Sequence, residues 1–342
     1  MIFILAFLNL FEAKYYTVVT GNTVQCELCF RKCIITEGSQ GFCRVRENRD
    51  GKLYTFTYGR PCGLQIDPIE LEPMYHMVPG HRNICVFTPS CNFRCKHCQN
   101  SHISQKGHKE LKTLHYSPKE VVEIAINSGC KSISHSINEP VVFYEYMYEI
   151  AKLAKSKGLL TLFHSNGSIS PEPLRELLKF MDGVTIDLKG FSEDFYKEIT
   201  SATLEPVLNT LKIIKDANVH LEIVYLIIPT FNDDTSMIRE CCKWIRNNLG
   251  KDVPLHFTRF FPRYKLSNLS PTPIRTLGVA REIALQEELN YVYIGNERHK
   301  GNNTYCPNCK KIIVYRINHA VIKNSISNGS CKFCNYEIPG IF

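Results

Sequence analysis

Three cysteines lie within eight residues of the stretch PSCNFRCKHCQN (89–100), as Cys91, Cys95 and Cys98 in a C-x3-C-x2-C pattern. A disulfide needs pairs and a structural zinc ion takes four ligands, so three thiolates match neither. Three thiolates on a 4Fe–4S cluster would leave the fourth iron open to a non-protein ligand. The pattern therefore predicts such a cluster. The alternative is a structural zinc or iron–sulfur site with Cys85, His97 or His102 as fourth ligand.

A second group of cysteines lies near the C-terminus, as two C-x2-C pairs on either side of the hairpin-like sequence IIVYRI (312–317). Two such pairs are typical of a zinc ribbon, in which one ion takes four thiolates. A rubredoxin-like iron with the same ligands is the alternative. The predicted ligands are Cys306, Cys309, Cys331 and Cys334.

A third group has the spacing C-x2-C-x3-C-x9-C and predicts a second metal site in the N-terminal region, at Cys26, Cys29, Cys33 and Cys43. We favour a structural metal such as zinc over an auxiliary cluster that would feed electrons inward. Grouped cysteines in a chain of this length indicate metal binding in a reducing compartment. The ungrouped cysteines are expected to be buried thiols.

The composition describes a globular protein, with 342 residues, 44% hydrophobic residues and a formal net charge of +8. The positive charge is spread along the chain, so it permits contact with nucleic acid without indicating it. The N-terminal stretch MIFILAFLNLF (1–11) is apolar, but it lacks a basic region and a cleavage site and is too short to span a bilayer. We expect a packed or frayed extension and a cytoplasmic protein without a membrane segment.

Strand-like and helix-like segments alternate between residues 84 and 299. Such alternation indicates a parallel sheet covered by helices, and no Rossmann fingerprint or P-loop follows the strands. We therefore predict an α/β fold with a partial (βα)6 TIM-type barrel at 84–299. It is flanked by a cysteine-rich N-terminal extension (1–83) and a zinc-ribbon-like C-terminal module (300–342).

Polar residues follow successive predicted strands at the ends where each strand stops. In parallel βα barrels the reactive groups lie at this edge, so we expect one shared site. Besides the three cysteines, the residues at this edge are Asn138, Glu139, Pro140, Ser165, Asn166, Gly167, Asp187, Lys189, Pro229, Asn232, Asp233, Arg259 and Arg263.

The cysteine loop and these strand ends resemble the radical S-adenosylmethionine superfamily. The resemblance implies that the open iron binds the amino and carboxylate groups of S-adenosylmethionine. An electron from the cluster then cleaves the sulfonium into methionine and a 5′-deoxyadenosyl radical. His97 stands where an aromatic residue usually faces the adenine, and Asn138, Glu139 and Pro140 resemble a motif that binds the methionine ammonium.

Two further strand ends resemble those of glycyl-radical-enzyme activases. Asp187 and Lys189 match an Asp-Leu-Lys motif that touches the methionine carboxylate and the ribose, and Asn166 lies in a matching Asn-Gly turn. His164 occupies the position of an activase aspartate, so the monovalent-cation site of those enzymes lacks that ligand here.

Longer phrases, among them CELCFRKCIITEGSQGFCRVREN and IDPIELEPMYHMVPG, resemble the AmmeMemoRadiSam system radical SAM enzymes, which are similar to pyruvate formate-lyase activating enzyme. Phe30 replaces a usual proline and Thr230 a common glycine, and neither change removes a ligand. The implied partners are Memo-type and AMME-region-type proteins and a flavodoxin- or ferredoxin-like electron donor.

The leading hypothesis is a radical enzyme that abstracts hydrogen from an unidentified substrate, and one form of it activates a protein partner. An alternative is radical modification of a small molecule or RNA. A different class is a non-catalytic metal-stapled scaffold or electron carrier, which would need no S-adenosylmethionine pocket. The sequence assigns no catalytic residue.

Overall fold

The computed structural model describes residues 10–342, and its centre is one eight-stranded sheet. The strands from β8 to β14 are parallel in chain order, and β7 pairs antiparallel with β8. No pairing between β7 and β14 closes the sheet within the described residues, so the predicted partial barrel is confirmed. The strands are β7 (Gly63–Pro68), β8 (Arg82–Phe87), β9 (Ser132–His135), β10 (Leu160–Ser165), β11 (Gly183–Asp187), β12 (His220–Ile227), β13 (Leu255–Arg259) and β14 (Val292–Gly295).

Strand β7 differs from the sequence prediction, which began the barrel at residue 84. It is an edge strand, and its residues are half-buried or exposed, so it lacks the apolar run of the inner strands. Its terminal Pro68 is tolerated because the outer side of an edge strand needs no hydrogen-bond donor. The sheet therefore extends into the region that we assigned to the N-terminal extension.

The predicted helices are present and follow the strands in order. Helix α2 begins with a complete capping box, because the Ser117 side chain accepts from the Glu120 N–H and the Glu120 carboxylate accepts from the Ser117 N–H. A 3-10 turn (Pro140–Phe143) leads directly into α3. The helices are α1 (Ser101–Ser104), α2 (Pro118–Asn127), α3 (Tyr144–Ser156), α4 (Pro171–Leu178), α5 (Glu193–Phe195), α6 (Glu205–Asp216), α7 (Thr235–Leu249) and α8 (Ile274–Gln286).

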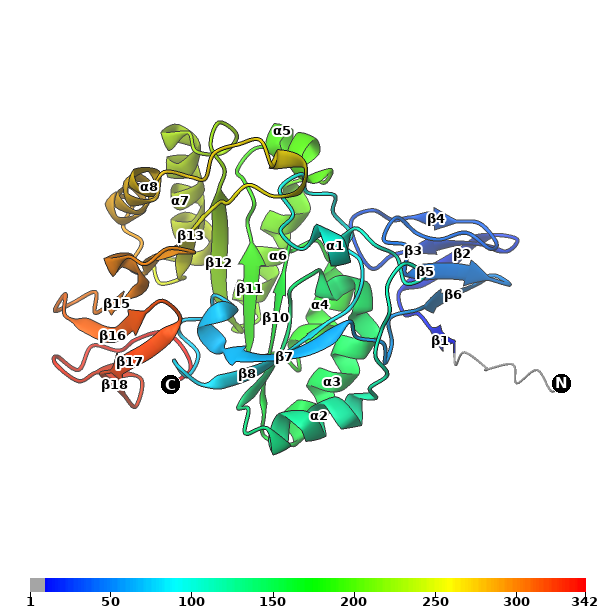
Figure 1. The fold of residues 1–342 in the computed structure, drawn as a ribbon, viewed down its shortest axis with the longest axis horizontal. Coiled ribbons are helices and arrows are strands. Elements are labelled where there is room, and N and C mark those ends of the chain that lie inside the picture. Colours follow the sequence, from blue (N-terminus) through cyan, green and yellow to red (C-terminus); the bar gives the residue numbers. More distant parts are fainter. Residues whose placement is uncertain (1–9) are drawn as a thin grey trace.

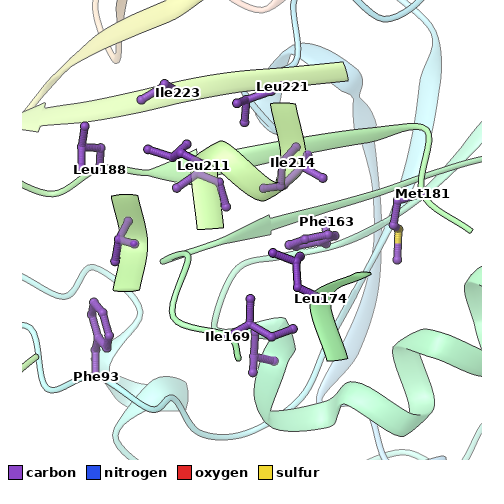
Figure 2. Packing of buried hydrophobic residues seen from close by; sticks show 14 of the residues in the cluster. Phe93, Phe163, Ile169, Leu174, Met181, Leu188, Leu211, Ile214, Leu221 and Ile223 are labelled. Atoms are coloured by element: carbon purple, nitrogen blue, oxygen red, sulfur yellow. The ribbon is translucent and has the colours of Figure 1, made fainter. Parts of the chain in front are cut away.

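The core lies between the sheet and the helices that cover it. Figure 2 shows Phe163 and Ile223 from strands packed near Leu174 and Leu211 from helices, and all four side chains are fully buried. Each such side chain contributes about 1.5–3 kcal/mol on burial. This packing holds neighbouring strands in register, so their carboxyl ends lie along one edge.

Two small β appendages flank the barrel on opposite sides (Figure 1). The N-terminal appendage has two three-stranded sheets, formed by β1 (Phe11–Glu12), β6 (Lys52–Thr55) and β5 (Arg46–Arg49), and by β2 (Tyr16–Thr20), β3 (Thr23–Cys26) and β4 (Ile34–Ile35). The C-terminal appendage contains β15 (Thr304–Tyr305), β16 (Ile312–Ile317), β17 (Ala320–Asn324), β18 (Ile326–Ser327) and β19 (Ser330–Cys331).

The predicted hairpin at 312–317 is confirmed, because β16 pairs antiparallel with β17. Most of the apolar stretch 1–11 lies outside the described residues. Within residues 10–342, every helix is too short or too polar to cross a membrane.

Candidate functional site

The loop that carries Cys91, Cys95 and Cys98 runs from the end of β8 to α1 and is tied to the next strand end. The Asn138 amide donates to the Ser90 carbonyl at 2.7 Å, and its carbonyl oxygen accepts from the Thr88 N–H at 3.4 Å. Ser90 has a φ of 86°, which is uncommon for a residue other than glycine. A strained backbone conformation persists only where neighbouring groups hold it in place. Asn138 therefore stabilises the strained turn immediately before the first cysteine.

Of the three thiols, Cys95 is buried and Cys91 and Cys98 are half-buried, and polar groups lie beside them, which suits an iron–sulfur cluster. Cys91 Sγ accepts from the Phe93 N–H at 3.3 Å, and the Ser104 hydroxyl lies 3.0 Å from Cys98 Sγ. Burial raises the pKa of the Cys91 thiol, and burial raises the pKa of Cys95 to about 12. Because metal ligands must be deprotonated, binding of iron would drive the loss of these protons.

Glu139 is a buried carboxylate between the ends of β9 and β10. One oxygen accepts from the Ser165 hydroxyl at 2.7 Å and the Val141 N–H at 3.1 Å, and the other accepts from the Asn166 N–H at 2.9 Å. Burial raises the pKa of Glu139 to about 7. A carboxylate has about four acceptor positions, so one remains for a further donor such as an ammonium group.

Asp187 and Lys189 form an ion pair at the end of β11. Lys189 Nζ lies 2.8 Å from one Asp187 oxygen, and His164 Nε2 lies 3.1 Å from the other. Despite opposing effects of burial, Lys189 and His164 hold the pKa of Asp187 far below its usual range, and Asp187 raises the pKa of His164 and Lys189. Lys189 has three N–H donors, so two remain for an anionic group.

The structure places the other predicted cofactor residues at the same edge, in two different roles. His97 is buried, no partner for its Nδ1 is found within residues 10–342, and burial together with Lys189 lowers its pKa to about 3. The Asn166 amide donates to Asn92 at 2.8 Å and lies 3.7 Å from Cys91 Sγ. Asn166 therefore supports the cysteine loop, whereas neutral His97 keeps a free polar atom.

Two outer strand ends differ in whether they join this site. The Asn232 amide donates to the Lys189 carbonyl at 2.8 Å, so the loop after β12 supports the Asp187–Lys189 pair. Arg259 is instead paired with Glu297 at 2.5 Å and donates to the Thr272 carbonyl. The shared edge predicted from the sequence thus holds from β8 to β12, but Arg259 is committed elsewhere.

Sequence reasoning missed Glu72 and Asn92. Glu72 is buried, accepts from the Ser134 hydroxyl at 2.7 Å and lies 3.9 Å from His164 Nδ1. Its only sequence signal is an acidic residue within the mostly apolar phrase IELEPMYHM. Asn92 lies between two cysteines, where a side-chain amide that reaches the next loop could have been suspected.

The four C-terminal cysteines are arranged for a single metal ion. Cys306 and Cys334 have their sulfur atoms 3.6 Å apart, and Cys309 and Cys331 have theirs 3.8 Å apart. A tetrahedron with metal–sulfur bonds of about 2.3 Å has edges of about 3.8 Å. Within residues 10–342 this is the only group of three or more potential metal ligands whose ligand atoms all lie within 4.8 Å of one another.

Comparisons with known proteins agree with this site. The Radical SAM superfamily profile matches residues 85–241. An uncharacterized protein of Methanocaldococcus jannaschii is 43% identical over 330 residues, covering 96% of this chain and 98% of that protein. The pyruvate formate-lyase-activating enzyme of Clostridium pasteurianum is 29% identical over 177 residues, 49% of this chain and 71% of that enzyme. A solved radical SAM methyltransferase from Sphaerobacter thermophilus shares the fold at a TM-score of 0.50 and 12% identity, over 64% of this chain and 67% of that one.

Proposed function

Because the chain belongs to the radical SAM superfamily, we propose that Cys91, Cys95 and Cys98 hold a 4Fe–4S cluster and that the surrounding strand ends bind S-adenosylmethionine. When bound, this pair of groups supplies a 5′-deoxyadenosyl radical, formed when one electron cleaves the sulfonium. The observation that carries the proposal is the convergence of three thiols, one buried carboxylate and one lysine at one sheet edge.

The side chains at this edge match the charges of the methionine part of the cofactor. Glu139 is buried, contacts no basic side chain among the described residues 10–342, and keeps one acceptor position for the ammonium. Lys189 keeps two donors for the carboxylate, while Asp187 and His164 fix its position. His97 lies beside this pair, and its Nδ1 has no partner among the residues that the structure describes, which suits contact with the adenine.

The substrate that fits the relatives best is a protein. Relatives named as activating enzymes of pyruvate formate-lyase match about half of this chain or more. We therefore propose an activase-like reaction, in which hydrogen is removed from a partner protein. The partners to test first are a glycyl-radical protein and the Memo-type and AMME-region-type proteins suggested by the sequence resemblance.

Anaerobic reconstitution tests the first part of the proposal. The protein is reduced with dithionite in the presence of S-adenosylmethionine, and 5′-deoxyadenosine is measured. We expect its formation by the wild-type chain and its loss in Cys95→Ala. A fully reconstituted wild-type protein that never forms 5′-deoxyadenosine would contradict the proposed chemistry. Hydrogen exchange from a deuterated partner protein into 5′-deoxyadenosine then tests the substrate class.

A further inference from the structure

The four N-terminal cysteines line one small cavity beside the barrel. The Cys26 N–H donates to the Cys33 carbonyl at 2.9 Å, so the loop that carries Cys29 closes on itself, and Cys43 lies just before β5. All four line a small pocket that is partly open to solvent and has a cavity volume of about 20 Å³. Its apolar walls come from both the appendage and the barrel, namely Leu28, Ile35, Phe42, Val141 and Val142.

The spacing of the sulfur atoms separates this group from the C-terminal one. Within residues 10–342, no three of the N-terminal cysteines have sulfur atoms within 4.8 Å of one another, and the same holds for Cys91, Cys95 and Cys98. Around one tetrahedral ion, sulfur atoms lie about 3.8 Å apart. In a 4Fe–4S cluster each thiolate binds a different iron, so the sulfur atoms are farther apart.

We propose that Cys26, Cys29, Cys33 and Cys43 ligate a second 4Fe–4S cluster. All four irons then carry thiolates and no coordination position is open, so this cluster transfers electrons and binds no substrate. It accepts one electron from a ferredoxin- or flavodoxin-type donor and passes one electron to the cluster at Cys91, Cys95 and Cys98, and no bond forms or breaks. The direction of transfer rests on the proposed function, whereas the ligation does not.

Arg46 offers hydrogen-bond donors to such an anionic cluster. Its guanidinium lines the cavity, is almost fully buried and lies 3.8 Å from Cys26 Sγ. The nitrogen at that distance, Nη1, also donates to the Lys14 carbonyl, and Nη2 contacts Glu145, but no partner is found for Nε within residues 10–342. A buried N–H without a partner is costly, and a cluster sulfur atom would accept from it.

The cavity is joined directly to the loop of the first cluster. The Ser90 hydroxyl donates to the Cys43 carbonyl, and Ser90 is bonded to Cys91. Arg31, another lining residue, donates from Nε to the Asn92 carbonyl at 2.6 Å. One hydrogen bond and a short covalent path therefore connect a ligand of the second cluster with a ligand of the first.

The ligation is tested on the full-length chain after anaerobic reconstitution, by iron and sulfide analysis and electron paramagnetic resonance. Cys91→Ala, Cys95→Ala and Cys98→Ala are combined in one variant. We expect it to keep half of the iron and to show, after reduction, a 4Fe–4S signal that S-adenosylmethionine does not change. Loss of all iron, or zinc in its place, would overturn the inference.

The reciprocal variant, Cys29→Ser with Cys43→Ser, guards against a folding artefact in the first. We expect it to lose half of the iron and to keep the signal that responds to S-adenosylmethionine. Full retention of iron would overturn the inference. Cys62→Ser changes a half-buried thiol outside both loops and is the control that should keep all of the iron.

The role in electron transfer is tested by comparing two reductants. In the reciprocal variant, the ratio of 5′-deoxyadenosine formed with reduced flavodoxin to that formed with dithionite should fall at least tenfold, and an unchanged ratio would overturn the relay. If the wild type forms no 5′-deoxyadenosine while the triple variant still holds a cluster, the proposed function fails and the second cluster stands. If the wild type forms 5′-deoxyadenosine but the triple variant holds no cluster, the proposed function stands and the second cluster is ruled out.

Discussion

Each of the two appendages is attached to the barrel by a buried arginine–glutamate ion pair, but the surroundings of the two arginines differ. Each carries four cysteines, and each has a fully buried arginine–glutamate pair, Arg46–Glu145 at 2.5 Å and Arg316–Glu70 at 3.4 Å. In both pairs the arginine comes from the appendage, while the glutamate comes from α3 or from the turn after β7. Burying a charge requires a partner, so each pair fixes where its appendage can sit.

The difference lies in the remaining donors of the two guanidinium groups. Arg316 donates to the Tyr75 and Asn302 carbonyls and to the Thr304 hydroxyl, so all of its nitrogens have partners. Arg46 has an Nε without a partner in the described part of the chain, and it lies in the wall of the cysteine cavity. We infer that Arg316 is an anchor only, whereas Arg46 is an anchor and also part of a metal site.

Removal of one ligand from each appendage should have the largest effect and should separate the two metals. If the C-terminal site holds zinc, as its two C-x2-C pairs predict, Cys306→Ser should lose most of it and loosen the tail, because structural zinc contributes about 10–16 kcal/mol of binding free energy in small domains. Iron should be unchanged. Cys29→Ser should instead lose iron and keep its zinc. Metal analysis of both variants decides, and loss of iron with retention of zinc in Cys306→Ser would show that the C-terminal site holds iron.

Breaking the two buried ion pairs should have the next largest effect. Glu145→Gln and Glu70→Gln should each lower the free energy of unfolding by about 3–5 kcal/mol, because each leaves a buried guanidinium without a counter-charge. Only Glu145→Gln should also reduce the iron content. Denaturant unfolding and iron analysis measure both effects. Glu149→Gln, on the same helix but without an ion pair in the described chain, is the control. Equal iron in both variants would remove the distinction between the pairs.

Glu139 sharpens the comparison because it is a third buried glutamate, and its hydrogen-bond partners include no arginine. We expect Glu139→Gln to keep its iron and to lose at least tenfold in S-adenosylmethionine affinity, or about 1.4 kcal/mol. A charge-assisted hydrogen bond to the ammonium is worth about 1.5–3 kcal/mol. Titration of the reduced cluster by electron paramagnetic resonance measures it. Glu172→Gln, in the first turn of α4, is the control, and an unchanged affinity in Glu139→Gln would contradict the assignment.

The pKa of Glu139 predicts the direction in which the affinity for S-adenosylmethionine changes with pH. Burial raises it to about 7, so the carboxyl favours the folded state when protonated, and this stability is lost as the pH rises through about 7. An ammonium ligand prefers the ionised form. The affinity of the wild type for S-adenosylmethionine should therefore rise between about pH 6 and 8, and Glu139→Gln should lose this rise. A rise that persists in the variant would assign it to another group.

The barrel and the cysteine loop could be predicted from the sequence because their signals are local. Ser117, Pro118 and Glu120 indicate the start of a helix within four residues, and the C-x3-C-x2-C pattern indicates the metal ligands within eight residues. Strand β7 was missed because an edge strand has no inward apolar run. Glu72 was missed because its partner His164 is distant in the sequence, so only the folded sheet brings them together.

The separation of the sulfur atoms in each four-cysteine group could not be predicted either, because it depends on how distant segments pack in the fold. Both four-cysteine groups contain C-x2-C, which gives the type of ligand but not the separation of the sulfur atoms. That separation depends on whether two hairpin turns face each other, as at Cys306 and Cys331, or one loop surrounds a cavity, as at Cys26 and Cys43. Thr230 shows the same limit, because only the structure gives its φ of 70°, which explains why glycine suits this position.

The smallest expected effect concerns an exposed ion pair that also joins the N-terminal appendage to the barrel. Arg44 lies 3.0 Å from Glu110, and both side chains are more than a third exposed. Glu110→Gln keeps an acceptor for the Gly107 N–H and removes only the charge. We expect a small destabilisation at low salt that vanishes at about 1 M salt, where the screening length is about 3 Å. The loss in Glu145→Gln should persist at both salt concentrations, because water and ions do not reach that pair. Denaturant midpoints of the two variants at both salt concentrations test this, and a salt-sensitive loss in Glu145→Gln would mean that the buried pair is open to solvent and does not anchor the appendage.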